Sequence, residues 1–290
     1  MKDNISFYCL GAVHTDIKAH SLIRPSKGES VPVKITTCPG GVACNIAVNL
    51  AHCGGQVALA SLVGCDQEGH ALIEALRLKN INTQNILISK LYPTAKYYAL
   101  LTPEGELFVA MADMNIYEEL KPELINPLIA ECSHISDWII DANILGPTIK
   151  IVAQNIKKHQ RLWGVGVSAH KTKNLRQGFG AYHGLIINQE ELRALTGIAG
   201  ELEAIQALKA QGCFYVVVTL GALGVYYADD KNIRFQEPRR AQVLDVTGAG
   251  DAFSAGVIFS LAHGQDFEEA LEKGFSLAAK AMNSRNSCLL

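Results

Sequence analysis

The chain has 290 residues, of which 49% are hydrophobic and 19% charged. That length supports a substantial core, and the composition excludes disordered, collagen-like and coiled-coil chains. Lys and Arg number 26 against 28 Asp and Glu, a net charge of -2, so neither nucleic acid nor a membrane surface is predicted as a partner. The longest uncharged apolar stretch, residues 213–228, contains Thr219, Gly221 and Gly224 and is shorter than the roughly 18 residues of a spanning helix.

The cysteines and the first residues indicate a cytoplasmic protein. The eight cysteines are scattered, with neither a C-x-x-C pair nor zinc-finger spacing, so we expect reduced and mostly buried thiols. The apolar run at residues 5–13 contains Ser6 and Cys9 and leads into a polar triplet without a small-residue cleavage site. This pattern is not typical of a secretory signal.

Strand and helix patterns alternate along the chain. Residues 6–13 are typical of a buried strand, and residues 42–52 of a helix that ends at Gly54. In chain order, we predict further strands at 56–62, 138–141, 162–167, 185–187 and 214–219, and further helices at 68–78, 148–159, 190–196, 201–211, 251–263 and 267–282. The alternation predicts a mostly parallel sheet with helices on both faces. Such sheets bind ligands beyond the carboxyl ends of their strands.

Two segments interrupt this alternation. Residues 17–38 and 92–112 have extended, hairpin-like patterns, the second with a turn at 102–106 (TPEGE). Together they predict a small extra sheet. Both segments lie downstream of elements whose loops should reach the ligand end, so they are candidates for a lid that excludes water. An ordinary edge hairpin explains the spacing equally well.

The sharpest motif is DVTGAGD at residues 245–251. Gly248, Ala249 and Gly250 let the backbone approach a ligand and lead into a helix whose free amides favour an anion. Asp251 lies in the first turn, where a carboxylate can cap the helix and contribute about 1 kcal/mol. Alternatively it takes a proton from an attacking hydroxyl, a contribution of about 10²–10⁴-fold. Because acids lie at both ends of the motif, at Asp245 and Asp251, the catalytic interpretation is favoured over the cap.

A second motif, PGGVACN at residues 39–45, opens the first long predicted helix. Gly40 and Gly41 allow a small ligand to lie against the backbone. Asn45 is the first residue of a polar helix face and is suited to bind a polyol. A helix start with a solvated asparagine face explains the same residues.

Two further motifs follow predicted strands. Glu191, three residues after Asn188, is placed to hold a metal through water, although a helix capped by Asn188 explains both residues. Residues 218–224 (VTLGALG) suit a nucleotide phosphate or ribose, or form a tight hairpin. They lack the Gly-Lys-Ser/Thr of a Walker A motif, and no G-x-G-x-x-G follows a strand, so a nicotinamide dehydrogenase has no support.

Taken in this order, the motifs resemble the PfkB or ribokinase-like carbohydrate kinase family. The resemblance covers nearly the whole chain, through residues 11–16 (GAVHTD), the Gly40-Gly41 helix, 63–69 (VGCDQEG), 188–191, 219–224 and 245–251. The last motif is highly specific, and the others gain weight from their order. The resemblance implies an α/β, ribokinase-like three-layer sandwich with a mostly parallel central sheet and a small β-lid. It also implies a single kinase domain over residues 1–290.

This resemblance implies ATP-dependent phosphorylation of a sugar or nucleoside hydroxyl, achieved mainly by positioning and electrostatics. Asp251 would be the base, and the amides of Gly248, Ala249 and Gly250 would form the anion hole. The other implied roles are Asp16, Gly40, Gly41 and Asn45 for substrate hydroxyls, Asn188, Thr219, Gly221 and Gly224 for ATP, Glu191 for magnesium through water, and Asp245 for a monovalent cation such as potassium. The family's lid often mediates dimerisation, which implies a homodimer.

Within the family, five stretches are similar to the pseudouridine kinases: 15–18 (TDIK), 39–47 (PGGVACNIA), 112–117 (ADMNIY), 141–143 (DAN) and 167–171 (VSAHK). They imply phosphorylation of the 5′-hydroxyl of pseudouridine to give pseudouridine 5′-phosphate. Asp16 and Asn45 would bind the ribose diol. The candidates for the uracil edge are Asp113, Asn143, Ser168 and Lys171; solvated polar side chains explain Ser168 and Lys171 as well. The alternatives are a family kinase for another nucleoside or sugar, such as ribose or a hexose, and a non-catalytic ligand-binding protein on the same scaffold.

One residue departs from the family pattern. His14 stands where the family usually has Asn, two residues before the acidic position. A histidine there can hydrogen-bond a ribose or stack on a base. It is also compatible with a changed substrate, with lost activity, or with a conformational replacement at a strand end.

Overall fold

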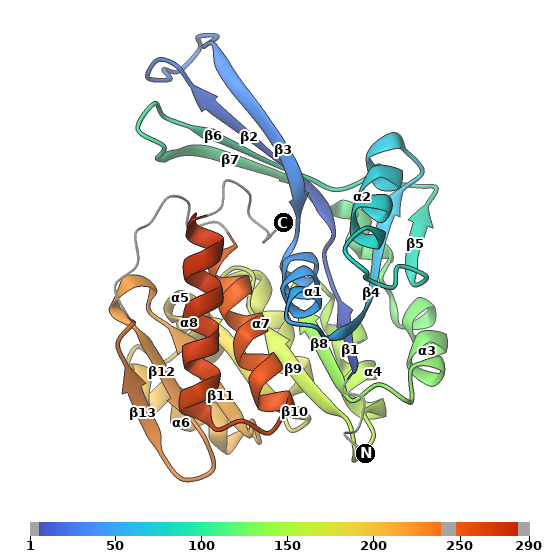
Figure 1. Cartoon of the computed structure of the whole chain (residues 1–290), viewed down its shortest axis with the longest axis vertical. Coiled ribbons are helices and arrows are strands. Elements are labelled where there is room, and N and C mark those ends of the chain that lie inside the picture. Colours follow the sequence, from blue (N-terminus) through green and yellow to red (C-terminus); the bar gives the residue numbers. More distant parts are fainter. Residues whose placement is uncertain (1–5, 239–247, 284–290) are drawn as a thin grey trace.

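The structure is a computed structural model that describes residues 6–238 and 248–283. Its centre is a nine-stranded sheet in the order β13-β12-β11-β10-β9-β8-β1-β4-β5 (Figure 1). The strands are β1 (Ser6–Leu10), β4 (Gln56–Gly64), β5 (Ile86–Ser89), β8 (Asp137–Asp141), β9 (Arg161–Val165), β10 (Tyr182–Asn188), β11 (Tyr215–Thr219), β12 (Val225–Ala228) and β13 (Ile233–Gln236). From β5 to β11 all neighbouring strands are parallel, while β12 and β13 pair antiparallel. The predicted mostly parallel sheet is confirmed.

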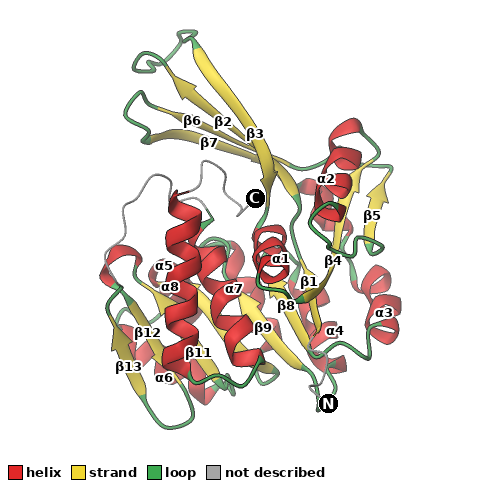
Figure 2. Cartoon of the chain, viewed as in Figure 1, coloured by secondary structure: helices red, strands yellow, loops and turns green. Residues whose placement is uncertain are grey.

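Helices cover both faces of this sheet (Figure 2), because successive side chains of a strand point to opposite sides. Phe7 and Cys9 of β1 belong to one core, whereas Tyr8 and Leu10 belong to the other. The first core packs against α1 (Val42–His52), α2 (Gln67–Arg77), α7 (Ala249–Ala262) and α8 (Phe267–Asn283), and the second against α3 (Pro122–Glu131), α4 (Gly146–Asn155), α5 (Gln189–Thr196) and α6 (Glu201–Ala210). The three-layer sandwich is confirmed.

Some element bounds differ from the expectation for local reasons. The helix expected at 148–159 begins earlier, at Gly146, because Pro147 is accommodated in its first turn, and ends at Asn155. Helix α3 was not predicted, since Pro122 and Pro127 interrupt its periodicity; Pro122 opens the helix and Pro127 lies inside it. The short strands β5, β12 and β13 were not predicted either.

A second, four-stranded sheet stands above the carboxyl ends of the parallel strands (Figure 1). It contains β2 (His14–Ser21), β3 (Val33–Gly40), β6 (Lys96–Leu101) and β7 (Leu107–Asp113), in the order β3-β2-β6-β7. The segments 17–38 and 92–112, expected to form a small extra sheet, supply most of these residues. The sheet ends at the pair formed by His14 and Gly40, next to the link that joins it to β1.

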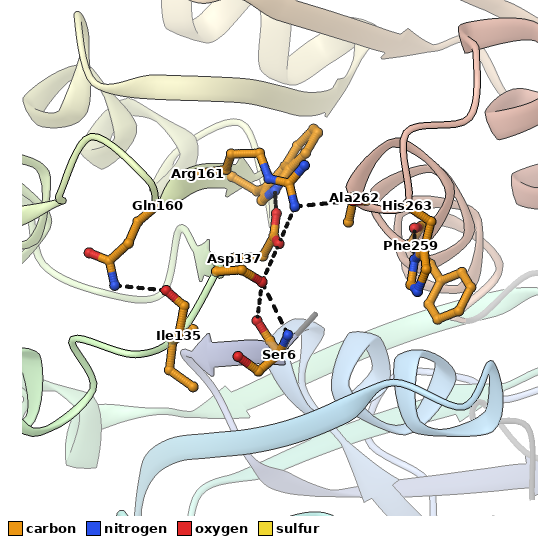
Figure 3. A network of polar contacts seen from close by, with 10 residues as sticks. Ser6, Ile135, Asp137, Gln160, Arg161, Phe259, Ala262 and His263 are labelled. Carbon is orange, nitrogen blue, oxygen red and sulfur yellow. Dashed lines mark hydrogen bonds and ion pairs between the residues drawn. The ribbon is translucent and has the colours of Figure 1, made fainter. Parts of the chain in front are cut away.

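At the opposite end of the main sheet, the buried carboxylate of Asp137 joins several elements (Figure 3). It accepts hydrogen bonds from Arg161 Nη2 at 2.6 Å, Trp163 Nε1 at 2.9 Å and the Ser136 hydroxyl at 2.8 Å. Arg161 also donates to the carbonyl of Ala262 at 3.2 Å. This network ties β8 and β9 to the last residue of α7.

In the described part of the chain, no helix is long and apolar enough to cross a membrane.

Candidate active site

A cavity of about 160 Å³ lies where β9, β10 and β11 end opposite the first turn of α7. Its lining residues are Val42, Val165, Gly166, Val167, Ile186, Ile187, Asn188, Glu191, Thr219, Gly250, Asp251 and Ser254. Five of them were predicted from the sequence. A larger, open hollow of about 560 Å³ lies between α4 and the 3₁₀ segment Lys171–Gly178, and its lining contains none of the predicted residues. The smaller cavity is therefore the candidate active site.

Asp251 lies in the first turn of α7, and its Oδ2 accepts a 2.7 Å hydrogen bond from Asn45 Nδ2. Burial raises the pKa of Asp251 to about 7; the Asn45 bond opposes this shift, and the charges of Asp141, Asp16 and Glu191 add to it. A carboxylate with a pKa near neutrality is suited to general base catalysis. These charges act on Asp251 from α5, β2 and β8, which indicates that the acids surround one region.

The backbone beside Asp251 has free amides that are suited to hold an anion. Gly248 adopts a left-handed conformation, with φ of 77°, and is the N-cap of α7. The amide of Ala252 donates to the Gly248 carbonyl at 2.9 Å, so the amides of Ala249, Gly250 and Asp251 precede the first bond of the helix. A Cβ at Gly250 would meet nothing within 4 Å. The space beside these amides is open to a phosphate.

Asn188 is the N-cap of α5, as the helix-capping interpretation predicted, and Glu191 completes a capping box with it. The Glu191 amide donates to Asn188 Oδ1 at 2.9 Å, and the Asn188 amide donates to Glu191 Oε2 at 2.9 Å. Glu191 is buried, which raises the pKa of its carboxyl group. A Cβ at Gly166 would lie 1.9 Å from Glu191 Oε2, so only glycine fits there. Asn188 and Glu191 also line the cavity. The capping box that follows β10 therefore also places the Glu191 carboxylate at the candidate site.

The carboxylates present fit magnesium bound mainly by phosphates and water. In residues 6–238 and 248–283, no cluster of three or more His, Cys, Asp or Glu side chains is arranged to hold a metal ion. Glu191 and Asp251 are the carboxylates that line the cavity. Magnesium keeps several waters and often takes one or two protein carboxylates together with substrate phosphates, and the two carboxylates here match the protein part of that donor set.

Asp141, to which the sequence analysis gave no role of its own, holds three backbone segments together at the carboxyl end of β8. Its Oδ2 accepts from the amides of Ala12 at 2.9 Å and Ala43 at 3.0 Å, and its Oδ1 from the amide of Asn143 at 2.8 Å. Burial raises the pKa of Asp141, while these three hydrogen bonds oppose the shift. A Cβ at Gly11 would lie 2.3 Å from Asp141 Oδ2. The sequence signal that could have identified Asp141 is its position as an acid at the end of a buried, apolar strand.

The glycine pair makes room for Asp16. The Asp16 side chain is buried on β2, and a Cβ at Gly40 would lie 2.4 Å from its carboxyl carbon. Gly41 has a φ of 107°, and a Cβ there would lie 2.2 Å from the carbonyl oxygen of Ala12. These two glycines therefore permit close packing around the start of α1, whether or not a ligand lies against them. The face carrying Asn45 is buried rather than solvated.

The residues expected at the uracil edge lie in different environments. Lys171 Nζ donates to Asn143 Oδ1 at 2.6 Å; burial lowers the pKa of Lys171, and the Asp141 charge opposes that shift. Ser168 accepts a 3.4 Å hydrogen bond from the Lys171 amide, as expected of a turn residue. Asp113 is exposed at the end of β7. The structure thus brings Asn143 and Lys171 together and leaves Asp113 outside that contact.

Of the remaining predicted residues, Thr219 lines the cavity at the end of β11. Gly221, with φ of 60°, and Gly224, with φ of 135°, lie in the turn that follows. A Cβ at Gly224 would lie 2.5 Å from the carbonyl oxygen of Gln236 on β13, so hairpin packing alone explains that glycine. Asp245 lies outside the described residues.

A carboxylate of raised pKa beside the free amides at the start of a helix, at the carboxyl ends of a parallel sheet, is an arrangement suited to a phosphotransferase with an alcohol acceptor. The sequence model of the pfkB family carbohydrate kinases matches residues 5–289, and the chain belongs to that family. It is a sugar or nucleoside kinase, and ATP is the phosphoryl donor used by ribokinase-like kinases.

Relatives and solved structures agree with this assignment. The chain is 29% identical to the pseudouridine kinase of Escherichia coli (strain K12) over 289 residues, covering 98% of this chain and 92% of that protein. It is 26% identical to the guanosine-inosine kinase of Exiguobacterium acetylicum over 293 residues, covering 97% and 95%. The structure of Arabidopsis thaliana ribokinase complexed with ribose and ATP superposes with a TM-score of 0.85 at 21% identity, covering 97% of this chain and 94% of that chain. That likeness shows the same fold.

Proposed function

We propose that the protein is an ATP-dependent pseudouridine kinase that converts pseudouridine to pseudouridine 5′-phosphate. The observation that supports phosphoryl transfer is the position of Asp251. This residue lies at the N-terminus of α7, has a pKa of about 7 and accepts a hydrogen bond from Asn45. The choice of pseudouridine is supported by the similar stretches in the sequence and by the pseudouridine kinase relative that covers 98% of the chain.

In the proposed reaction, ionised Asp251 accepts the proton of the substrate's 5′-hydroxyl as its oxygen bonds to the γ-phosphorus of ATP. The bond from that phosphorus to the bridging oxygen breaks, and ADP leaves. The amides of Gly248, Ala249 and Gly250 stabilise the charge on the transferred group. The Asn45 hydrogen bond orients the Asp251 carboxylate toward the acceptor. Asn188, Thr219, Gly221 and Gly224 bind ATP in this proposal.

Magnesium would be held by the ATP phosphates and, through water, by Glu191, and would neutralise phosphate charge. The Glu191 side chain is already fixed by its bond with the Asn188 amide, so it would not need to be ordered by the metal. We further propose that Asp245 binds a monovalent cation such as potassium, as the family resemblance implies.

Substrate recognition is proposed to involve both sides of the Asp141 cluster. Asp16, Gly40, Gly41 and Asn45 would contact the ribose. The Asn143–Lys171 pair presents an ammonium and an amide to the uracil edge, where carbonyl and N–H groups alternate; Asp113 is proposed to complete that contact. Asp141 fixes the backbone of Ala12, Ala43 and Asn143 and so places the two groups relative to one another.

The second sheet is proposed to act as a lid and as a dimer interface within a single kinase domain. Every residue of β7 is exposed, including Leu107, Phe108, Val109 and Met111. Ile35 of β3 is also 59% exposed. Exposed apolar side chains gathered on one small sheet are typical of a surface that another element or subunit covers.

The expected cytoplasmic location, drawn from the cysteines, stays a prediction.

A coupled assay of ADP formation tests the proposal with pseudouridine, uridine, adenosine, guanosine, inosine, ribose and fructose 6-phosphate as acceptors. We expect the highest kcat/KM for pseudouridine. A preference for guanosine or inosine would identify a guanosine-inosine kinase, like the relative from Exiguobacterium acetylicum. A preference for ribose or a hexose phosphate would identify a sugar kinase. ATP binding without turnover on any acceptor would identify a ligand-binding protein on a kinase scaffold.

A further inference from the structure

The open hollow between α4 and the 3₁₀ segment Lys171–Gly178 lies on the other side of the main sheet from α7. Its volume of about 560 Å³ is within the usual range of sites for small molecules. The lining residues are Leu145, Gly146, Pro147, Lys150, Lys173, Asn174 and Gln177. None of them lines the candidate active site, so the hollow is a separate cavity.

Both charged side chains that line this hollow are cations. Lys150 reaches it from α4 and Lys173 from the 3₁₀ segment, and no carboxylate is among the lining residues. Within the part of the chain that the structure describes, neither ammonium group forms an ion pair. Two like charges that face one concave surface without a counter-charge attract an anion.

The two lysines belong to a basic segment of an otherwise slightly acidic chain. Residues 142–189 contain seven Lys and Arg and neither Asp nor Glu, whereas the whole chain has a net charge of -2. Three of these cations have hydrogen-bond partners inside the fold: Arg161, Lys171 and Arg176. Lys150 and Lys173 have no such structural use. Their charges are therefore available to a ligand in the hollow.

The other lining residues indicate which anion fits. No arginine lines the hollow, and arginine is the side chain whose planar fork matches a carboxylate, whereas lysine binds phosphate as a point charge. A phosphate monoester carries a charge of about -1.5 to -2 at pH 7, which two ammonium groups balance. The amides of Asn174 and Gln177 donate and accept hydrogen bonds, and Leu145 and Pro147 add apolar surface. These walls suit an organic group attached to the phosphate.

We propose that this hollow is a second ligand site, which binds a phosphate monoester of a sugar or nucleoside. The phosphate lies between the ammonium groups of Lys150 and Lys173, and the side-chain amides of Asn174 and Gln177 contact the organic part. The site is independent of the proposed function, because it shares no lining residue with the candidate active site.

The hollow is joined to the acceptor side by the same 3₁₀ segment. The segment begins at Lys171, whose ammonium donates to Asn143 Oδ1 at 2.6 Å, and Asn174 Nδ2 donates to the carbonyl of Ala142 at 3.3 Å. A ligand that draws Lys173 toward α4 acts on this segment. Occupancy of the hollow should therefore change KM for the acceptor with little change in kcat. This second part rests on the proposed function, because it requires that Asn143 and Lys171 contact the acceptor.

Calorimetric titration of the full chain tests the site. Magnesium and a non-hydrolysable ATP analogue are included to occupy the nucleotide site, and the titrants are inorganic phosphate, ribose 5-phosphate, uridine 5′-monophosphate and uncharged uridine. The wild type should bind at least one of the two esters more tightly than inorganic phosphate. Lys150→Gln/Lys173→Gln should weaken binding of that ester roughly tenfold or more, the loss expected for hydrogen bonds to a charged group. Its affinity for uridine should be unchanged.

Lys157→Gln/Lys158→Gln is the matched control. It removes the same charge from two exposed lysines that follow the other end of α4 and do not line the hollow. Its affinity for the ester should equal that of the wild type. An equal loss in this control would show that net charge alone governs binding, and it would overturn the site. Equal ester affinities in the wild type and Lys150→Gln/Lys173→Gln would overturn it too.

The remaining outcomes separate the ligand and the link to the acceptor. Inorganic phosphate that binds as tightly as either ester would indicate an adventitious ion only and would reject the proposed ligand. Steady-state assays then compare KM for the best acceptor with and without the tighter ester. A change in KM that is the same in the wild type and the hollow variant would assign the effect to the active site and overturn the link. Turnover of no acceptor would overturn the proposed function, while the calorimetric comparison would still decide the site.

Discussion

The side-chain amide of Asn45 donates a 2.7 Å hydrogen bond to Asp251, joining residues that are 206 positions apart. The bond connects the first turns of α1 and α7, which pack on the same face of the main sheet. It couples the helix that follows the glycine pair to the helix that carries the proposed base. The carboxylate proposed to take a proton from the substrate is thereby held by a residue proposed to bind that substrate.

Replacing Asp251 by Asn should remove turnover and preserve nucleotide binding. Asparagine has nearly the same shape but cannot accept the hydroxyl proton, so kcat is expected to fall by about 10²–10⁴-fold. The amides at the start of α7 are unchanged, so the dissociation constant for ATP, measured by calorimetry, should stay close to that of the wild type. Loss of ATP binding in parallel with turnover would instead indicate a structural role for Asp251.

The pH dependence of kcat/KM should report the ionisation of Asp251. Because the base is active when ionised and its pKa is about 7, kcat/KM should rise with pH through neutrality and level off above it. Asn45→Ala removes the hydrogen bond that favours the charged carboxylate, so the pKa should increase. A bond of this kind corresponds to a shift of about one pH unit. An acidic limb near pH 4 in the wild type would contradict the assignment.

Asp251 should also make the protein less stable at alkaline pH. Its pKa is about 7 in the folded chain, against 3.8 when unperturbed. The folded state therefore binds the proton more tightly than the unfolded state, and this contribution is fully present below pH 3.8 and lost as the pH rises through 7. We expect Asp251→Asn to have a higher melting temperature than the wild type at pH 8, with the difference shrinking toward pH 4. A lower melting temperature at pH 8 would contradict this.

Asp141→Ala should destabilise the protein and disturb its substrate side. The substitution leaves the amides of Ala12, Ala43 and Asn143 without their acceptor, and each unsatisfied buried amide costs about 1–3 kcal/mol. The midpoint of urea unfolding should fall accordingly. Asp141→Asn keeps one acceptor oxygen and should lose less stability. Equal stability of the two variants would show that the hydrogen bonds are replaced, for example by water.

Arg161→Leu should be costly because it leaves the Asp137 carboxylate buried without its cation (Figure 3). Breaking a buried pair on one side costs about 3 kcal/mol or more; the partial exposure of Arg161 places the expectation at the low end. Arg193→Leu is the matched control, because its bridge to Glu201 is at the surface and should contribute less than about 1 kcal/mol. Chemical denaturation of both variants measures the difference. Similar losses would show that water solvates Asp137.

Local sequence patterns predicted much of the fold. Residues 42–52 form α1 with the expected bounds, because periodic apolar residues and the turn at Gly54 act within the segment itself. A helix N-cap at Asn188 was one of two interpretations of its motif, and the cap is present as part of a capping box with Glu191. Helix α3 was missed because Pro127 lies inside it, where packing of the helix against the sheet outweighs a poor local propensity.

The sequence by itself determined the alternation of strands and helices, the glycine turn before α7 and the acid that follows it, since each depends on neighbours within a few residues. Only the tertiary structure decided that Asn45 would reach Asp251, that Asp141 would hold three separate amides, and that His14 would face Asp16 at the base of the second sheet. The first two depend on how distant elements pack around the common sheet, and the third on the strand geometry that makes alternate residues share a face. Charges and burial shift a pKa through space rather than along the chain, so the raised pKa of Asp251 depends on how those elements are assembled.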